Sequence, residues 1–291
     1  MLFKGRRQSG NVLDFRGGGG PKMGFRGGII GTLVIALIIW ILGGNPMAVL
    51  QDMTSTSQSP TSNVTAPAAG NDEMGEFVRV VLADTEDVWN KIFSESGETY
   101  REPTLVLFNG AIRSACGNAQ SSSGPFYCPG DERIYIDLDY LQLLQQQLGA
   151  QGDFAAAYII AHEVGHHVQK LLGTLNHLDR LRSSGASEDE INEMSVRTEL
   201  QADFLAGVWV HHGQRMKNFL EQGDIEEALN AAAAVGDDKI QMATQGSVHP
   251  DSFTHGTAAQ RKAWLKKGME TGDVSQGNTF GQQQQGPYSR Q

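Results

Sequence analysis

Residues 157–172 read AYIIAHEVGHHVQKLL and place two histidines and a glutamate inside an apolar, helix-forming run. Four residues separate His162 from His166, so on a helix both side chains lie on one face and can point a ring nitrogen at the same ion. Glu163 lies about 100° around the helix from His162, where its carboxylate can approach a water molecule on that ion. The H-E-x-x-H spacing therefore predicts a metal site, although the pattern also arises by chance.

Zinc suits this spacing because neutral imidazoles are good zinc ligands and the bound ion lowers the pKa of its water towards about 7. A catalytic zinc has three protein ligands and one open position. Downstream, residues 198–209 read TELQADFLAGVW and offer Glu199 and Asp203, four residues apart on a predicted helix. We predict that Glu199 is the third ligand. Asp203 is expected to accept the far ring N–H of His162 or His166.

The residues around the motif have alternative interpretations. Glu199 and Asp203 would otherwise be two solvated carboxylates of a helix, and His211 and His212 are alternative ligands more than two turns further along that helix. His167 lies off the metal face and is expected to be hydrogen-bonded or solvated.

If the zinc-bound water attacks a peptide carbonyl and Glu163 takes its proton, the site also needs a hydrogen-bond donor for the oxyanion that forms. His255 lies in a predicted loop just before a capped helix, from which its side chain can reach across a cleft, and it is our first choice. His249, Tyr135 and Tyr158 are the rival donors. Each of these residues is otherwise an ordinary turn or core residue.

The periodicity of apolar residues predicts a mixed α+β domain, mainly helical with a small sheet. A helix is expected over 77–93, and strands over 104–110 and 133–140. Strand 133–140 is either an interior strand or an edge that pairs with an extended peptide. The motif helix should run from an N-cap at Asp153 to about Leu172, before a left-handed Gly173. Three more helices are expected from the cap pairs Ser187 with Glu190, Asp224 with Glu227 and Thr257 with Gln260.

The N-terminal part of the chain carries a long apolar run. No charged side chain lies between Arg26 and Asp52, and residues 27–46 are long enough to cross a bilayer as a helix. Residues 1–26 hold six Lys and Arg against one Asp. The positive-inside rule then places the N-terminus in the cytoplasm and the rest of the chain beyond the membrane. A cleaved signal peptide is the rival interpretation.

Composition divides the chain into five parts. We expect a basic cytoplasmic N-terminus over 1–26, a transmembrane signal anchor over 27–46 and a flexible Ser, Thr and Pro-rich linker over 47–75. The folded domain should occupy 76–271, and a disordered Gln and Gly-rich tail 272–291.

Charge and cysteine content limit the partners. The net charge is −10, and the acidic balance beyond the N-terminus argues against nucleic acid, which needs clustered Lys and Arg. Cys116 and Cys128 are the two cysteines of the chain. Outside the cytoplasm they are expected to form a disulfide, with two free thiols as the alternative. A zinc site made of cysteines is disfavoured because the chain lacks two close Cys pairs.

The quoted motifs, together with KGRRQSGNVLDFRGGG at residues 4–19 and SFTHGTAAQR at residues 252–261, resemble the bacterial "putative neutral zinc metallopeptidase" family, the YpfJ-like proteins of the zincin superfamily. The resemblance implies a zincin-like fold and a membrane-tethered, zinc-dependent peptidase. It also implies His162, His166 and Glu199 as ligands and Glu163 as the catalytic base. Thr198 stands where thermolysin-type enzymes usually have Asn, so thermolysin's substrate-binding residues are not carried over.

The expected activity is therefore hydrolysis of peptide bonds in a peptide or protein substrate, with one catalytic zinc ion. The expected location is the cytoplasmic (inner) membrane, single-pass, with the N-terminus in the cytoplasm and the catalytic domain in the periplasm or outside. Two alternatives remain open. One is a catalytically inactive zinc-binding interaction or assembly protein of the cell envelope, and the other is a structural zinc site closed by His255 or His211.

Overall fold

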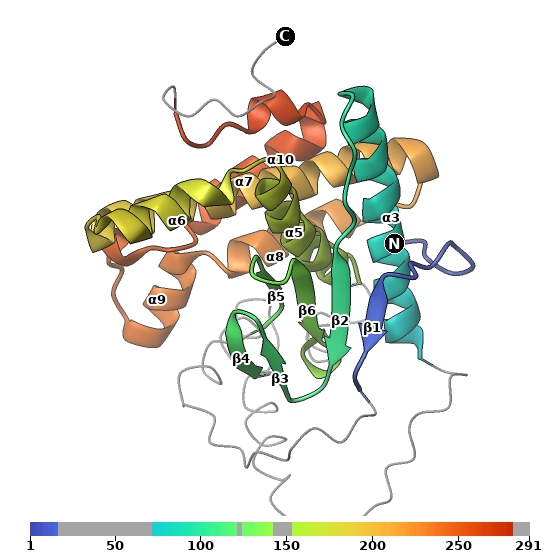
Figure 1. Ribbon diagram of the computed structural model, residues 1–291, viewed down its shortest axis with the longest axis horizontal. Helices are drawn as coiled ribbons and strands as arrows, with labels where there is room; N and C mark the ends of the chain where they lie inside the picture. The colour runs from blue at the N-terminus through green and yellow to red at the C-terminus, as the bar shows by residue number, and fades with distance from the viewer. Residues whose placement is uncertain (17–71, 121–123, 142–152, 282–291) are drawn as a thin grey trace, which may run out of the picture.

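The computed structural model describes residues 1–16, 72–120, 124–141 and 153–281. Within these ranges the fold is mixed α+β and mostly helical, with a small sheet at one end of the molecule (Figure 1). The strands are β1 (Val12–Asp14), β2 (Thr104–Phe108), β3 (Ala111–Ser114), β4 (Gly117–Gln120), β5 (Phe126–Cys128) and β6 (Arg133–Asp137). The α-helices are α3 (Glu73–Glu95), α5 (Asp153–Leu171), α6 (Leu175–Ser184), α7 (Glu188–Lys217), α8 (Asp224–Ala234), α9 (Asp237–Gln245) and α10 (Ala258–Thr271).

The main sheet has four strands in the order β1-β2-β6-β5. β1, β2 and β6 run parallel, whereas β5 is antiparallel to β6. β6 therefore lies between two other strands. Of the two predictions for residues 133–140, the interior strand is confirmed and the free edge that pairs with a peptide is wrong. The strand with an unpaired edge on that side is β5.

Alternation along β2 divides its side chains between two cores. Leu105 and Leu107 face the large helical core. Val106 and Phe108 face a small cluster on the other side of the sheet, which also holds Cys128. Cys128 forms a disulfide with Cys116, as predicted, and this bond joins the turn between β3 and β4 to the end of β5.

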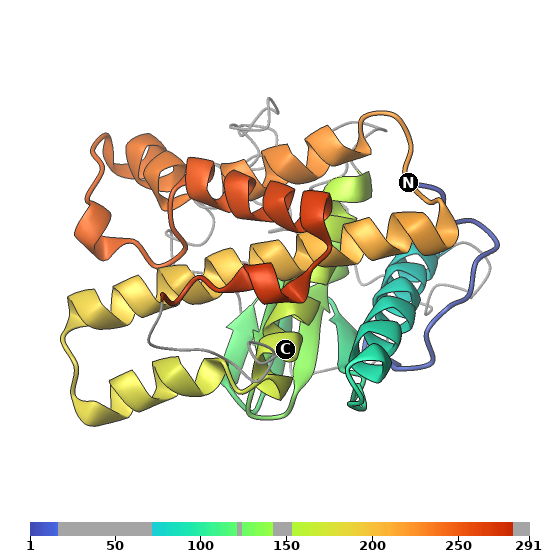
Figure 2. The same ribbon diagram turned by 90° about the horizontal axis from the view of Figure 1, so that it is seen from above.

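Helix α7 packs against both α5 and α10 (Figure 2). Glycines at these crossings allow a close approach. A Cβ atom added to Gly165 of α5 would lie 2.9 Å from the carbonyl oxygen of Ala202 on α7. Between α7 and α10, a Cβ on Gly207 would lie 2.2 Å from the carbonyl oxygen of Leu265. These contacts fix α5 against α7, and α7 against α10.

Most predicted helix ends agree with the structure. The capping boxes of Ser187 with Glu190 and of Thr257 with Gln260 are both formed, and Gly173 is left-handed with φ +76°. Asp153 and Asp224 are the first residues of their helices, one position beyond the N-cap. The sequence analysis did not predict α6 or α9.

The structure moves both predicted limits of the folded domain. Residues 1–16, which we separated from the domain, form β1 and pack on α3 and β2. Residues 272–281, assigned to a disordered tail, pack on α7: the side chain of Arg197 donates to the carbonyl oxygen of Phe280 at 3.0 Å, and Phe280 is buried. Both segments remain attached because they bury apolar side chains and pair their backbone polar groups.

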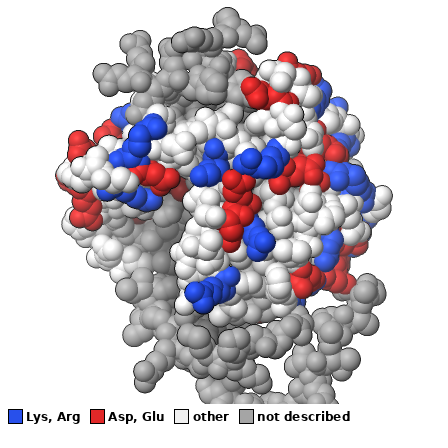
Figure 3. Space-filling model, viewed as in Figure 1, with Lys and Arg blue, Asp and Glu red and all other residues white. Residues whose placement is uncertain are grey.

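The predicted anchor at 27–46 and nearly all of the predicted linker at 47–75 lie outside the described residues. Within the described ranges, no helix has the length and apolar character needed to cross a membrane. On the face drawn in Figure 3, Lys and Arg lie interspersed with Asp and Glu.

Candidate metal centre

Three predicted ligands meet at the crossing of α5 and α7. The Nε2 atom of His162 lies 3.1 Å from Oε2 of Glu199, and the Nε2 atom of His166 lies 3.4 Å from Oε1 of the same carboxylate. One ligand atom from each residue lies within 4.8 Å of the others. The helical spacing of the two histidines and the position of Glu199 along α7 thus bring three donors to one point.

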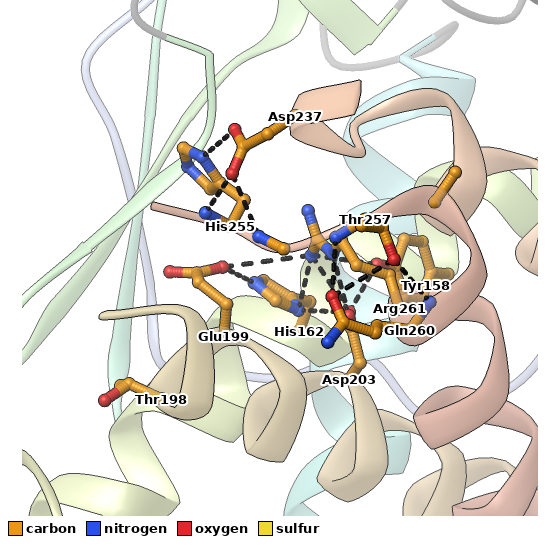
Figure 4. A network of polar contacts seen from close by, with 12 residues as sticks. Tyr158, His162, Thr198, Glu199, Asp203, Asp237, His255, Thr257, Gln260 and Arg261 are labelled. Atoms are coloured by element: carbon orange, nitrogen blue, oxygen red, sulfur yellow. Dashed lines mark hydrogen bonds and ion pairs between the residues drawn. The ribbon is translucent and has the colours of Figure 1, made fainter. Parts of the chain in front are cut away.

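Asp203, one turn beyond Glu199 on α7, holds the far nitrogen of His162 (Figure 4). Its Oδ1 lies 2.9 Å from Nδ1 of that ring. Asp203 is fully buried, and an ionised carboxylate can only accept, so Nδ1 of His162 carries the hydrogen. This tautomer leaves Nε2 free for a metal. The predicted role of Asp203 fits this geometry.

Arg261 on α10, which was not predicted as a site residue, supports Asp203. Its Nε donates to Oδ2 of Asp203 at 2.8 Å, and the hydroxyl of Tyr158 donates to Oδ1 at 2.6 Å. Burial acts to raise the pKa of Asp203, but the positive charges of Arg261 and His162 lower it below its usual range. A buried charge pair of this kind needs several hydrogen bonds to be tolerated, and here they are present.

The far nitrogen of His166 has a different partner. Its Nδ1 lies 2.9 Å from the amide oxygen Oε1 of Gln169, one turn along α5. Gln169 is itself fixed, since its amide nitrogen donates to the carbonyl oxygen of Thr198 at 2.7 Å. The i, i+3 spacing of His166 and Gln169 in HEVGHHVQ was a visible signal for this contact, and the sequence analysis did not use it.

Electrostatics couple the three donors. Burial acts to lower the pKa of His162, but Asp203 and Glu199 outweigh it and raise the pKa to about 10. In the same way, Glu199 raises the pKa of His166 against the effect of burial. Burial acts to raise the pKa of Glu199, and the two histidines hold it well below its usual range. Without a metal, the raised histidine pKa values favour protonated imidazoles beside the ionised carboxylate of Glu199.

Comparisons with known proteins agree with this arrangement. The model of the "putative neutral zinc metallopeptidase" family matches residues 1–280. The chain belongs to this family. The protein YpfJ of Escherichia coli K12 is 47% identical over 286 residues, which are 97% of this chain and 99% of the relative. The protein Rv2575 of Mycobacterium tuberculosis H37Rv is 39% identical over 253 residues, 82% of this chain and 84% of the relative. No solved structure matches the chain.

The donor set fits the zinc that this family name implies. Two imidazole nitrogens and one carboxylate are a common protein ligand set for catalytic zinc. The second ring nitrogen of each histidine is held by Asp203 or Gln169, which is the usual way a zinc-binding imidazole is oriented. His162, His166 and Glu199 would hold the ion.

A second group of carboxylates in the described residues could also hold an ion: Asp153, Asp224 and Glu227. Here the amino group of Met1 already provides a positive charge, 2.7 Å from Oδ1 of Asp153 and 3.5 Å from Oδ1 of Asp224. This group lacks histidine and lies at the N-terminal ends of α5 and α8, away from the metal centre.

Glu163, the predicted base, lies beside the cluster on α5. It is 8% exposed, and its negative charge contributes to the raised pKa of His166. Among the described residues, no protein group forms a hydrogen bond with its carboxylate. Its oxygens are therefore available to a water molecule or substrate.

His255, our first choice as oxyanion donor, lies beside Asp237 and near the carboxylate of Glu199 (Figure 4). Its side chain is half exposed, and its Nδ1 lies 3.2 Å from Oδ1 of Asp237. Asp237 also accepts the backbone N–H groups of Thr254, His255 and Gly256, which fixes the loop. Burial acts to lower the pKa of His255, but Asp237 and Glu199 raise it. The sequence analysis did not identify Asp237.

The rival oxyanion donors are bound elsewhere. The hydroxyl of Tyr158 is committed to Asp203, and that of Tyr135 donates to Asp131 at 2.7 Å in the small core beyond the sheet. His249 lies 3.1 Å from the hydroxyl of Ser247 in an exposed turn.

The remaining histidines named from the sequence also lie outside the cluster. His211 and His212 contact the carbonyl oxygens of Met269 and Gly272, each at 2.8 Å, at the end of α10. His167 is fully buried, with Nε2 2.6 Å from the carbonyl oxygen of Arg101. It is hydrogen-bonded, as expected, and burial lowers its pKa.

Proposed function

We propose that this protein is a membrane-associated zinc metalloendopeptidase that hydrolyses peptide bonds in proteins or peptides. The observation that carries this proposal is the convergence of two imidazole Nε2 atoms on the carboxylate of Glu199, with the other ring nitrogens held by buried acceptors. The exposed neighbourhood of His255 and the free carboxylate of Glu163 support catalysis in addition to metal binding. A purely structural site has no use for a base beside the ion.

Each side chain of the site has its own role in the proposed reaction. Zinc, when bound, supplies a Lewis acid for the attacking water and the peptide carbonyl. Glu163 accepts the proton of the water and passes it to the nitrogen of the leaving amine. Because Asp237 holds Nδ1 of His255, the raised pKa favours the doubly protonated ring, whose Nε2–H can donate to the developing oxyanion.

The apolar run at 27–46 supports attachment to the cytoplasmic membrane. The disulfide between Cys116 and Cys128 supports a catalytic domain outside the cytoplasm, because such bonds persist in oxidising compartments. The substrates would then be proteins or peptides of the periplasm or the exterior.

The test compares wild-type protein with Glu163→Gln on a broad peptide library. We expect both to bind one zinc ion, and we expect the wild type alone to cleave, because Gln keeps the shape of Glu163 but accepts no proton. Removing zinc with a chelator should stop wild-type cleavage, and added zinc should restore it. Glu193→Gln, on the exposed face of α7, is the matched control and should cleave like the wild type.

Cleavage that persists in Glu163→Gln would refute the mechanism. Zinc binding without any wild-type cleavage, together with specific capture of envelope proteins, would instead favour the inactive interaction or assembly protein.

A further inference from the structure

The first sixteen residues, here called the N-terminal arm (residues 1–16), form an edge of the main sheet. β1 of the arm pairs in parallel with β2, with Val12 opposite Leu105. The flanking backbone also pairs: the N–H of Leu105 donates to the carbonyl oxygen of Asn11, and the N–H of Phe15 to that of Leu107, both at 2.9 Å. The arm is thus an integral strand of the domain that holds the metal centre (Figure 1).

The basic residues of the arm neutralise carboxylates of α3. Arg6 lies 2.7 Å from Oδ1 of Asp84, whose side chain is fully buried. Arg7 lies 2.9 Å from Oε2 of Glu86, whose side chain is 2% exposed, and also contacts Asp87. A buried carboxylate that loses its partner is strongly destabilising. These arginines therefore have a structural role within the fold.

The two ends of the segment that contains the apolar run meet directly. Arg16 precedes residues 17–71, and Asp72 follows them. Nη1 of Arg16 donates to Oδ1 of Asp72 at 2.9 Å, and the charge of Arg16 contributes to a lowered pKa of that carboxyl. A single crossing of a hydrocarbon layer would separate these two residues by roughly 30 Å.

From these contacts we propose that the N-terminal arm and the metal centre lie on the same side of the membrane. The positive-inside rule placed the arm in the cytoplasm because it carries Lys and Arg. The structure gives three of the six basic charges of residues 1–26 a role within the domain, since Arg6, Arg7 and Arg16 are paired with its carboxylates. A single-pass anchor would place the arm and the metal centre on opposite sides of the membrane, so the proposal replaces the single-pass topology expected from the sequence.

Labelling of single cysteines in the full-length chain tests this proposal without requiring activity. Gln8→Cys lies on the exposed arm and Ser183→Cys on exposed α6, while Cys116 and Cys128 are bonded to each other and resist labelling. Intact cells are treated with a membrane-impermeant maleimide, before and after permeabilisation. We expect the two variants to behave alike, both labelled before permeabilisation or both only afterwards. Labelling of one variant in intact cells and of the other only after permeabilisation would overturn the proposal.

A stability comparison checks that the arm is docked. Arg6→Gln should lower the melting temperature of the full-length protein by several degrees, because buried Asp84 would keep Lys217 as its one charged partner among the described residues. Lys4→Gln is the matched control: Lys4 pairs with Glu73 on the surface, both side chains being more than half exposed, and its loss should leave the melting temperature nearly unchanged. Failure of Arg6→Gln to fold would also support docking, whereas equal melting of the two variants would contradict it. Neither result bears on whether the metal centre cleaves peptides.

Discussion

At the scale of single residues, the metal centre depends on which nitrogen of each histidine carries a hydrogen. Asp203 and Gln169 hold the Nδ1 atoms, so the Nε2 atoms of His162 and His166 face Glu199. Both histidine pKa values are raised in the metal-free protein. A zinc ion must therefore displace protons from the site before it binds.

Because zinc binding displaces protons, the stability of the metal-free protein and its zinc affinity should both depend on pH. The pKa of His162 is raised from 6.5 to about 10, so its pairing with Asp203 and Glu199 stabilises the metal-free protein fully below pH 6.5, and this contribution is lost as the pH rises towards 10. Zinc binding at pH 7 should release protons, because the pKa values of both His162 and His166 are raised in the metal-free protein. Calorimetry in buffers of different ionisation enthalpy measures this release. Zinc affinity should increase with pH, and an affinity independent of pH between 6 and 9 would contradict the assignment.

The acceptor that orients His162 can be tested separately. Asp203→Asn should weaken zinc binding by roughly 10- to 100-fold, because Asn holds the ring less strongly and removes the closer of the two carboxylates that Arg261 pairs with, Glu199 lying 3.8 Å away. Competition with a chromophoric chelator measures the affinity. Asp238→Asn is a suitable control, since that carboxylate accepts the backbone N–H of Ala258, away from the metal centre. Equal zinc affinity in the two variants would show that Asp203 does not orient the ligand.

At the scale of elements, two helices must cross at a fixed distance. His162 and His166 come from α5 and Glu199 from α7, so the donor set depends on the close approach at Gly165. The capping box at Ser187 fixes where α7 begins and hence where Glu199 lies along it.

Substitution of this glycine tests the crossing. Gly165→Ala would place a Cβ 2.9 Å from the carbonyl oxygen of Ala202 and push α7 away from α5. We expect a loss of roughly 1–3 kcal/mol in stability from overpacking, together with a weakened zinc affinity. Val164→Ala, a buried neighbour on α5, is the control: it should lower stability but leave zinc affinity unchanged. Wild-type zinc affinity in Gly165→Ala would mean that the crossing does not set the metal geometry.

The elements also show what local sequence can and cannot predict. His162, His166 and the two capping boxes were predicted because they depend on neighbours within one helical turn. Arg261 and Asp237 were missed because they reach the site from α10 and α9, some 60 and 40 residues beyond Glu199 respectively, and no local pattern reports such contacts.

At the scale of the whole molecule, the N-terminal arm shows where composition misled the interpretation. A cluster of Lys and Arg before an apolar run is typical of a cytoplasmic flank, and on that basis residues 1–26 were separated from the domain. The structure pairs Arg6 and Arg7 with buried carboxylates of α3 and adds β1 to the sheet. Parallel pairing between strands so far apart in the chain leaves no signal in the local sequence.

The C-terminal boundary was missed for a related reason. The stretch after Gly272 is polar enough to suggest disorder, yet the hydroxyl of Thr279 donates to the carbonyl oxygen of Arg197 at 2.6 Å, and Phe280 is buried. The apolar side chains of Val274 and Phe280 and a few backbone contacts hold the segment in place, which composition alone underestimates.

The central claim is that this centre hydrolyses peptide bonds by using Glu163. The most direct measurement incubates an envelope protein extract with wild-type protein or with Glu163→Gln, each loaded with equal zinc, and maps every new protein N-terminus. Our proposal predicts a reproducible set of new N-termini with the wild type that is absent with Glu163→Gln. The same set in both samples, or none in either at full zinc occupancy, would contradict it.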